Sequence, residues 1–287
     1  MRGKAVCHGA ATIVNAIATG KGAAFGISLR TWAEVELTST QGIEVEIEGF
    51  EDEDPRLARR CVENVLHTYA KNDGYGAKVK TRSEIPISRG LKSSSAAANA
   101  VVIATLKALE VDCEPLEAIR IGTISAIEAG VSVTGAFDDA CASYFGGVVV
   151  TDNTKDYVVK RDVMRTDLKV VIDVPPFQIR KKDLPLERIR SLRKMVDIAF
   201  GCALGGDYLG AMTLNGLCYS SALGLDQTAS IEALRKGAQA AGLSGTGPAT
   251  VILVERKKVD KFVEGFLQRE NLIITDIYNG NAREASP

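Results

Sequence analysis

The sequence predicts a globular protein in which α-helices alternate with β-strands. Segments that favour strands alternate with segments that favour helices in the first half, and the chain closes with a strand, a helix and a strand. Its 287 residues suffice for two modest domains, and 46% hydrophobic with 25% charged residues is typical of a globular protein. The polar turn at 152–155 is the expected boundary, which gives units 1–155 and 156–287.

In the first half, alternating apolar side chains predict strands at 35–37, 43–47 and 77–81, and an apolar run predicts one at 148–151. A helix is expected from Asp54-Pro55 to residue 69, a second over 93–109, and a third over 115–129, where Pro115 stands near the start. The first half therefore mixes both kinds of element.

The second half begins with a predicted strand at 170–174, which Pro175-Pro176 ends. Helices are expected over 184–204, 207–222 and 230–241. The tail reads as a strand at 250–254, a helix at 258–269 and a strand at 272–278.

Charge and cysteine usage exclude several function classes. With 35 basic and 36 acidic residues the net charge is −1, so no global field attracts nucleic acid or an anionic membrane. Six scattered cysteines form no CxxC pair, and two histidines make a transition-metal site improbable. Because the N-terminus has no apolar signal core and no apolar run reaches about 18 residues, we expect a cytoplasmic protein.

The most informative segment is 86–98 (PISRGLKSSSAAA), a strand end and a glycine turn followed by a helix that opens on three serines. Hydroxyls at a helix start ordinarily cap its free N–H groups. Those N–H groups and the positive end of the helix dipole also suit a phosphate. The segment alone leaves capping and phosphate binding both open.

A second segment, 243–249 (LSGTGPA), places two glycines and two hydroxyls in a short turn between a helix and a strand. Glycine lets a backbone approach a ligand closely, although a plain helix-to-strand connection would use the same residues. The spacing matches neither GxGxxG nor GxxxxGK[ST], so a dinucleotide fingerprint and a P-loop are excluded.

Carboxylates mark a third segment. Glu128 stands at the C-terminal end of its predicted helix, where a negative charge opposes the dipole, so it is either a solvated surface residue or a ligand for a hard cation such as Mg²⁺. Asp138-Asp139 precedes a stretch of small and apolar residues. One of the pair can cap that stretch while the other serves in chemistry.

Together with 3–9 (GKAVCHG), these segments resemble the four motifs of the GHMP kinases, in family order and across nearly the whole chain. The phosphate loop corresponds to 90–96 (GLKSSSA), although Lys92 stands where many members have another glycine. The C-terminal glycine motif corresponds to 243–248. The sequences of two segments, SRGLKSSSAAANA and TGAFDDACASYFGG, are most similar to those of the archaeal-type shikimate kinases.

The resemblance implies a two-lobed α+β fold, with an N-terminal lobe like ribosomal protein S5 domain 2 and a ferredoxin-like C-terminal lobe. It implies transfer of phosphate from ATP to the 3-hydroxyl of shikimate, within aromatic amino-acid biosynthesis. Asp139 would be the catalytic carboxylate, with Asp138 in reserve, and Lys4 would lie near the reacting hydroxyl. Ser94 and Glu128 would hold Mg²⁺. The implied ATP-binding residues are Ile87, Ser88, Arg89, Gly90, Leu91, Lys92, Ser93, Ser94, Ser95, Ala96, Gly245 and Gly247.

Two alternatives remain open at this stage. One is another kinase of the family, acting on homoserine or mevalonate, although homoserine kinases generally lack the catalytic aspartate. The other is a non-catalytic sensor that kept the fold. A pocket that binds shikimate also needs a cation for the carboxylate of that substrate. Candidates are Arg30, Arg82, Arg89, Arg180 and Lys181.

Overall fold

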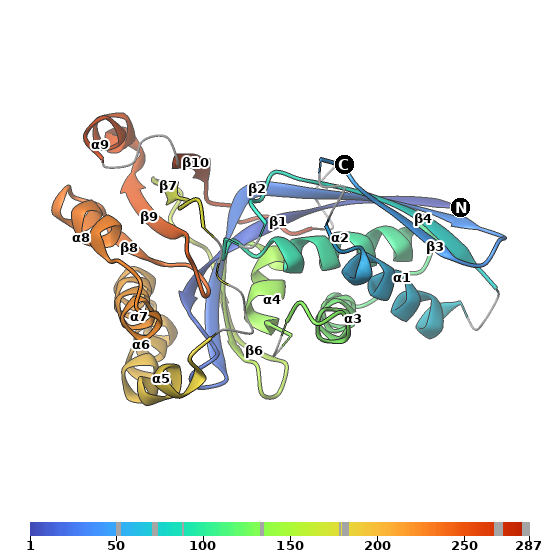
Figure 1. Ribbon diagram of the computed structural model, residues 1–287, viewed down its shortest axis with the longest axis horizontal. Helices are drawn as coiled ribbons and strands as arrows, with labels where there is room; N and C mark the ends of the chain where they lie inside the picture. The colour runs from blue at the N-terminus through green and yellow to red at the C-terminus, as the bar shows by residue number, and fades with distance from the viewer. Residues whose placement is uncertain are drawn as a thin grey trace.

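The computed structural model describes residues 1–49, 53–70, 74–87, 89–132, 135–177, 179, 184–266 and 272–282. Within them the chain forms two lobes that lie side by side, each built on its own β-sheet with helices packed against it (Figure 1). No helix in these ranges is long and apolar enough to cross a membrane.

The first sheet is organised by one long strand, β2 (Lys21–Thr38). One edge of β2 pairs with β1 (Arg2–Val14) along most of its length, and the other edge pairs with two strands in turn. Its second half meets β4 (Gly76–Ser83), and its first half meets β5 (Val148–Asp152). Beyond these lie β3 (Ile43–Ile47) next to β4, and β6 (Tyr157–Asp162) next to β5.

Helices α1 (Arg56–Tyr69), α2 (Ser93–Ala108), α3 (Pro115–Glu128) and α4 (Phe137–Phe145) lie together on one side of this sheet (Figure 1). α2 is buried on nearly all sides, which its small alanines permit. It approaches β1 so closely that a Cβ on Gly3 would lie 2.1 Å from the carbonyl oxygen of Ala104. This close contact fixes the C-terminal half of α2 against the sheet.

The second sheet is antiparallel and has the order β10-β7-β9-β8, formed by Leu272–Asp276, Leu168–Asp173, Thr250–Glu255 and Ala240–Leu243. Helices α5 (Leu186–Ser191), α6 (Arg193–Gly205) and α7 (Tyr208–Leu223) form a group in this lobe, and α7 contacts both β8 and β1. On the other side, α8 (Thr228–Arg235) and α9 (Val259–Gly265) enclose a small separate core. A 3-10 turn, η2 (Arg256–Lys258), joins β9 to α9.

Most predicted elements are confirmed, including α1, α2, α3 and the strand-helix-strand tail of β9, α9 and β10. β1 and β6 were not predicted. β1 was missed because both of its faces are buried along most of its length, so its sequence lacks an alternating pattern. The single helix expected over 184–204 is divided at Leu192 into α5 and α6.

Two predictions of organisation are wrong. The helix expected over 230–241 ends at Arg235, because Gly237 has a positive φ of 91° and residues 240–243 join the sheet as β8. The turn at 152–155 does not separate two units, since it connects β5 to β6 within the first sheet. That sheet therefore continues to Asp162.

Candidate active site

A cavity of about 540 Å³ lies where the two lobes meet. The loop before α2, the turn between β8 and β9, and the start of α4 all contribute to its wall, together with residues at the end of β1. The three segments that the sequence singled out are thus brought to one place by the fold. The first and the last of these segments lie more than 100 residues apart in the chain, so only the packing of the lobes brings them together.

The loop before α2 has the shape of an anion cradle. Lys92, with φ 65° and ψ 32°, is the last residue before the helix, and no side chain caps the helix start. The first N–H groups of an α-helix have no partner within the helix, so those of the serine-led turn remain available to a ligand. Ser93, Ser94 and Ser95 all line the cavity.

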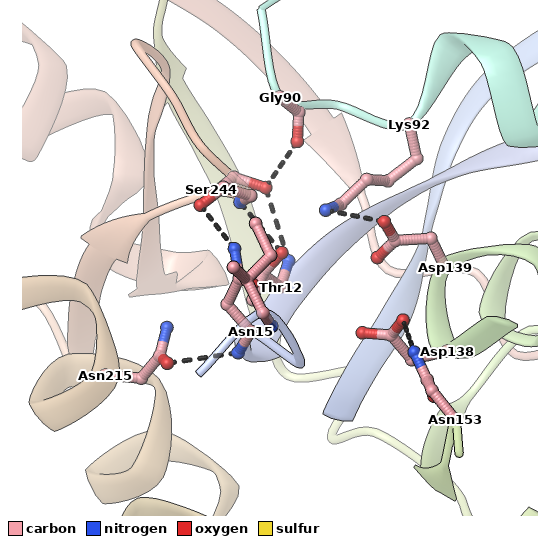
Figure 2. Close-up of polar contacts among 11 residues, drawn as sticks. Thr12, Asn15, Gly90, Lys92, Asp138, Asp139, Asn153, Asn215 and Ser244 are labelled. Carbon is pink, nitrogen blue, oxygen red and sulfur yellow. Dashed lines mark hydrogen bonds and ion pairs between the residues drawn. The ribbon is translucent and has the colours of Figure 1, made fainter. Parts of the chain in front are cut away.

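The turn between β8 and β9 holds this loop in place. Ser244 Oγ donates a hydrogen bond to the carbonyl oxygen of Gly90 at 2.7 Å and accepts one from the backbone N–H of Thr12 at 3.2 Å (Figure 2). Thr12 Oγ1 in turn accepts from the N–H of Gly245 at 2.8 Å. Gly90 has a φ of +85°, and a Cβ there would lie 2.1 Å from the carbonyl oxygen of Ser244, so glycine is required at this crossing.

A second buried network ties the segment after β1 to the other lobe. The backbone N–H of Asn15 donates to Asn215 Oδ1 on α7 at 3.0 Å, and the Nδ2 of Asn15 donates to the carbonyl oxygen of Gly245 at 2.8 Å (Figure 2). The hydroxyl of Tyr219, also on α7, donates to the carbonyl oxygen of Asn15 at 3.0 Å. Because all of these groups are buried, each bond is costly to lose.

Across the cavity, Asp139 lies in the first turn of α4 and forms an ion pair with Lys92, with 2.9 Å between Lys92 Nζ and Asp139 Oδ2 (Figure 2). The two side chains are only 8% and 11% exposed. The other oxygen, Asp139 Oδ1, is buried and has no hydrogen-bond partner among the described residues. A carboxylate oxygen in that situation is ready to accept a proton or a hydrogen bond from a ligand.

Asp138 also lines the cavity, but its carboxyl group has different partners. Its Oδ1 accepts a hydrogen bond from Asn153 Nδ2 at 2.8 Å (Figure 2), and its carboxyl packs against Gly22 of β2. Burial, and next the charge of Asp139, raises the pKa of Asp138 to about 7. The neighbouring carboxylates are therefore distinguished by their surroundings, and Asp139 is the one that faces the phosphate loop. Neither caps the helix with its side chain, since the N-cap position belongs to Ala136.

The structure does not bring Lys4 to Asp139. Lys4 lies near the start of β1, 52% exposed, and its Nζ pairs with Glu34 at 3.0 Å. It does not line the cavity, and Lys92 takes the position beside Asp139 that the resemblance assigned to Lys4. The reason is register: Lys4 lies directly opposite Glu34 in the β1–β2 pair.

Glu128 does not share the cavity wall with Ser94. It is exposed at the end of α3, it accepts a hydrogen bond from Asn64 Nδ2 at 2.9 Å, and it does not line the cavity. Among the described residues, no cluster of three or more His, Cys, Asp or Glu could hold a metal ion. Of the expected Ser94–Glu128 pair, only Ser94 lies on the cavity wall.

The remaining predicted ATP-binding residues divide into two groups. Those that line the cavity are Ile87, Gly90, Lys92, Ser93, Ser94, Ser95, Gly245 and Gly247. Leu91 and Ala96 are fully buried in the core beneath the loop, and Arg89 donates from Nη2 to the carbonyl oxygen of Pro176 at 3.0 Å. Ser88 lies outside the described residues.

Two of the arginines considered for the substrate carboxylate have other roles. Arg30 and Arg82 flank the ring of Trp32, with guanidinium carbons 4.8 and 5.2 Å from its centroid. Both also pair with exposed glutamates. Arg180 and Lys181 lie outside the described residues.

Sequence reasoning missed Thr12 and Asn15. Both line the cavity and are more than nine-tenths buried, within the apolar stretch AATIVNAIA. A polar residue inside an apolar segment is a signal, because buried polar groups need partners. Their partners, however, stand 200 or more positions later in the chain, so the sequence alone could not supply them.

Comparisons with known proteins identify the family of this chain. The model of the GHMP kinases N terminal domain matches residues 56–147. A shikimate kinase of Methanothrix thermoacetophila is 50% identical over 284 residues, covering 99% of this chain and 96% of the relative. A shikimate kinase of Methanococcoides burtonii is 48% identical, covering 90% of this chain and 89% of the relative.

Among solved structures, a homoserine kinase from Cytophaga hutchinsonii superimposes with a TM-score of 0.76 at 19% identity, covering 97% of this chain and 96% of that one. At that identity the likeness concerns the fold alone, and it confirms the predicted two-lobed α+β architecture. Since identity to the two curated relatives is about one half over nearly the entire length, the chain belongs to the GHMP kinases, in the branch of the shikimate kinases.

Proposed function

We propose that this protein transfers the γ-phosphoryl group of ATP to the 3-hydroxyl of shikimate, giving shikimate 3-phosphate and ADP. The observation that carries the proposal is the position of the Asp139–Lys92 pair, which faces the cavity beside the serine-led start of α2. One wall therefore suits a phosphate chain, and the opposite wall offers a carboxylate to an acceptor hydroxyl. The choice of shikimate as the acceptor rests on the two close relatives.

Phosphoryl transfer requires in-line positioning and neutralised phosphate charge more than covalent help from the protein. In the step, the 3-hydroxyl oxygen forms a bond to the γ-phosphorus while the bond from that phosphorus to the β,γ-bridging oxygen breaks. The bridging electrons leave with ADP, and the hydroxyl proton passes to Asp139. The unpartnered Oδ1 of Asp139 is the oxygen suited to receive it.

The triphosphate is held by the start of α2, where backbone N–H groups and the helix dipole favour negative charge. Gly245 and Gly247 lie opposite, and their lack of a side chain leaves room for the phosphates. Magnesium would be held in part by the phosphates and would neutralise their charge. Ser94, on the cavity wall, would be its protein ligand, and Glu128 would have to leave Asn64 to join it.

The direct test is ADP release from Mg-ATP with shikimate, homoserine and mevalonate offered separately to the purified protein. Turnover with shikimate alone is the expected result, and it should be accompanied by a phosphorylated product identified by mass spectrometry as shikimate 3-phosphate. The variant Asp139→Asn serves as the negative control, since contaminating kinases would be unaffected by it.

Two results would contradict the proposal. Turnover with homoserine or mevalonate instead of shikimate would keep phosphoryl transfer and reject the acceptor. Silence with all three acceptors, in a preparation that binds ATP, would favour a non-catalytic member of the family.

A further inference from the structure

Lys92 occupies a position that a lysine is poorly suited to fill. Its φ of 65° lies in the left-handed region, which is unfavourable for any residue with a Cβ and costs glycine nothing. It also directly precedes a helix N-terminus, where the dipole disfavours a cation, and its side chain is only 8% exposed. Backbone strain that persists at a cavity wall is characteristic of a functional residue.

One compensating contact is the ion pair with Asp139, and the ammonium group has a second neighbour. A Cβ built on Gly245 would lie 2.9 Å from Lys92 Nζ, so the ammonium also stands against the glycine turn of the other lobe. It thus lies between the start of α2, the turn at Gly245 and Asp139. Among the described residues that line the cavity, Lys92 is the single lysine or arginine.

The geometry points to Lys92 as a catalytic residue, which binds the γ-phosphoryl group of ATP during its transfer while it remains beside Asp139. The inference rests on the proposed phosphoryl transfer and names the cation for that step. In the step the acceptor oxygen–phosphorus bond forms, the bond from phosphorus to the bridging oxygen breaks, and the proton goes to Asp139. Lys92 forms no covalent bond. Its charge offsets the charge on the phosphoryl oxygens as they pass between donor and acceptor.

The position of Lys92 explains how the active site can have a cation although Lys4 lies on the surface. The resemblance assigned a lysine near the reacting hydroxyl to β1, and in this protein Lys4 pairs with Glu34 outside the cavity. The phosphate loop supplies the cation instead, from a residue that many members of the family replace by glycine. The lysine therefore comes from the same segment that holds the phosphates.

The test compares Lys92→Met and Lys92→Gly with Lys4→Met. Glycine is the second variant because it suits the left-handed backbone, so it removes the ammonium without straining the loop. Both Lys92 variants should lose about 10²–10³-fold in kcat, the usual effect of removing one transition-state stabilising group. Lys4→Met should lose no more than a few-fold, since it removes only an exposed ion pair. Equal kcat for wild type and Lys92→Gly, or a larger loss in Lys4→Met, would overturn the inference.

Binding measurements separate contact with the γ-phosphoryl group from mere shaping of the loop. By calorimetry, Lys92→Gly should bind the non-hydrolysable triphosphate adenylyl imidodiphosphate about tenfold or more weakly than wild type, with ADP affinity nearly unchanged. An equal loss for both nucleotides would show that Lys92 only positions the loop, which overturns the inference. If wild type fails to phosphorylate shikimate, the proposed function fails, while this comparison of nucleotides still tests Lys92.

Discussion

Ser244 Oγ donates to the carbonyl oxygen of Gly90 at 2.7 Å, although the two residues are 154 positions apart and belong to different lobes. The same hydroxyl accepts from the backbone of Thr12, so one buried atom joins β1, the phosphate loop and the β8–β9 turn. The phosphate loop is therefore shaped by the second lobe as well as by the helix it precedes. A change in the relative position of the two lobes would therefore also change the geometry of the phosphate loop.

Replacing Ser244 by alanine should destabilise the protein by about 1–3 kcal/mol, because it leaves the Thr12 N–H and the Gly90 carbonyl without their partner. The KM for ATP should rise as the loop loses its anchor. Urea unfolding and steady-state kinetics measure the two effects. Ser143→Ala is the matched control, since Ser143 is equally buried and its Oγ has no partner among the described residues. If the two alanine variants have the same free energy of unfolding and the same KM for ATP, the Ser244 hydrogen bonds do not stabilise the loop.

Gly90→Ala should raise the KM for ATP sharply or prevent folding, because the new Cβ would lie 2.1 Å from a backbone oxygen at a φ of +85°. Gly49→Ala separates the two causes. Its φ of +81° imposes the same backbone strain, and nothing lies within 4 Å of the added Cβ. We expect Gly49→Ala to show only a modest loss of stability, with unchanged ATP affinity. A similar kinetic defect in both variants would assign the effect to strain alone.

Asp139→Asn should lower kcat by about 10²–10³-fold and leave ATP affinity nearly unchanged, since it removes the acceptor of the hydroxyl proton and keeps the shape of the side chain. Asp138→Asn should have a clearly smaller effect, because Asp138 faces Asn153 and Gly22 instead of the phosphate loop. Single-turnover rates together with ATP binding measure both. The opposite ranking of the two variants would make Asp138 the catalytic carboxylate.

His8 should contribute a loss of stability in mild acid. This side chain is buried against the ring of Tyr278, with ring centroids 3.5 Å apart, and burial, with the Arg30 charge second, lowers its pKa to about 4. Between an unfolded-state pKa of about 6.5 and pH 4, the unfolded chain binds a proton that the folded chain does not, so stability declines as the pH falls through that window.

The variant His8→Phe keeps the stacked ring and cannot bind the proton. Its free energy of unfolding, measured by urea titration from pH 7 to pH 4, should therefore decline less steeply than that of wild type. His67→Phe, at an exposed position, should follow the wild-type curve. Parallel curves for wild type and His8→Phe would show that His8 takes up no proton on unfolding.

Local patterns were sufficient for most helices and for the serine-led start of α2, because capping residues, prolines and helical spacing act over a few positions. They failed where burial removes the pattern, as in β1, which is buried on both faces along most of its length. They also failed at residues 240–243, where small residues compatible with a helix form an edge strand because β9 offers them backbone partners.

For the site, the sequence motifs identified the phosphate loop, the glycine turn and the Asp138-Asp139 pair as parts of one active site, and all three line the cavity. They could not show which aspartate faces the loop, because adjacent residues in a helix point in directions about 100° apart. The distinction depends on tertiary contacts: Asp138 is bonded to Asn153 and packs against Gly22, whereas Asp139 pairs with Lys92 of the phosphate loop.

By itself, the sequence determined the family, the mixture of helices and strands, and the residue types on which phosphate binding and proton transfer depend. Those properties depend on short segments, in which neighbouring residues determine the backbone conformation and its hydrogen bonds. Only the tertiary structure decided that Lys92, and not Lys4, stands beside Asp139, and that Ser244 anchors Gly90. Such pairs form between segments that meet only after two sheets and their helices have packed, so their geometry follows from burial over the whole chain.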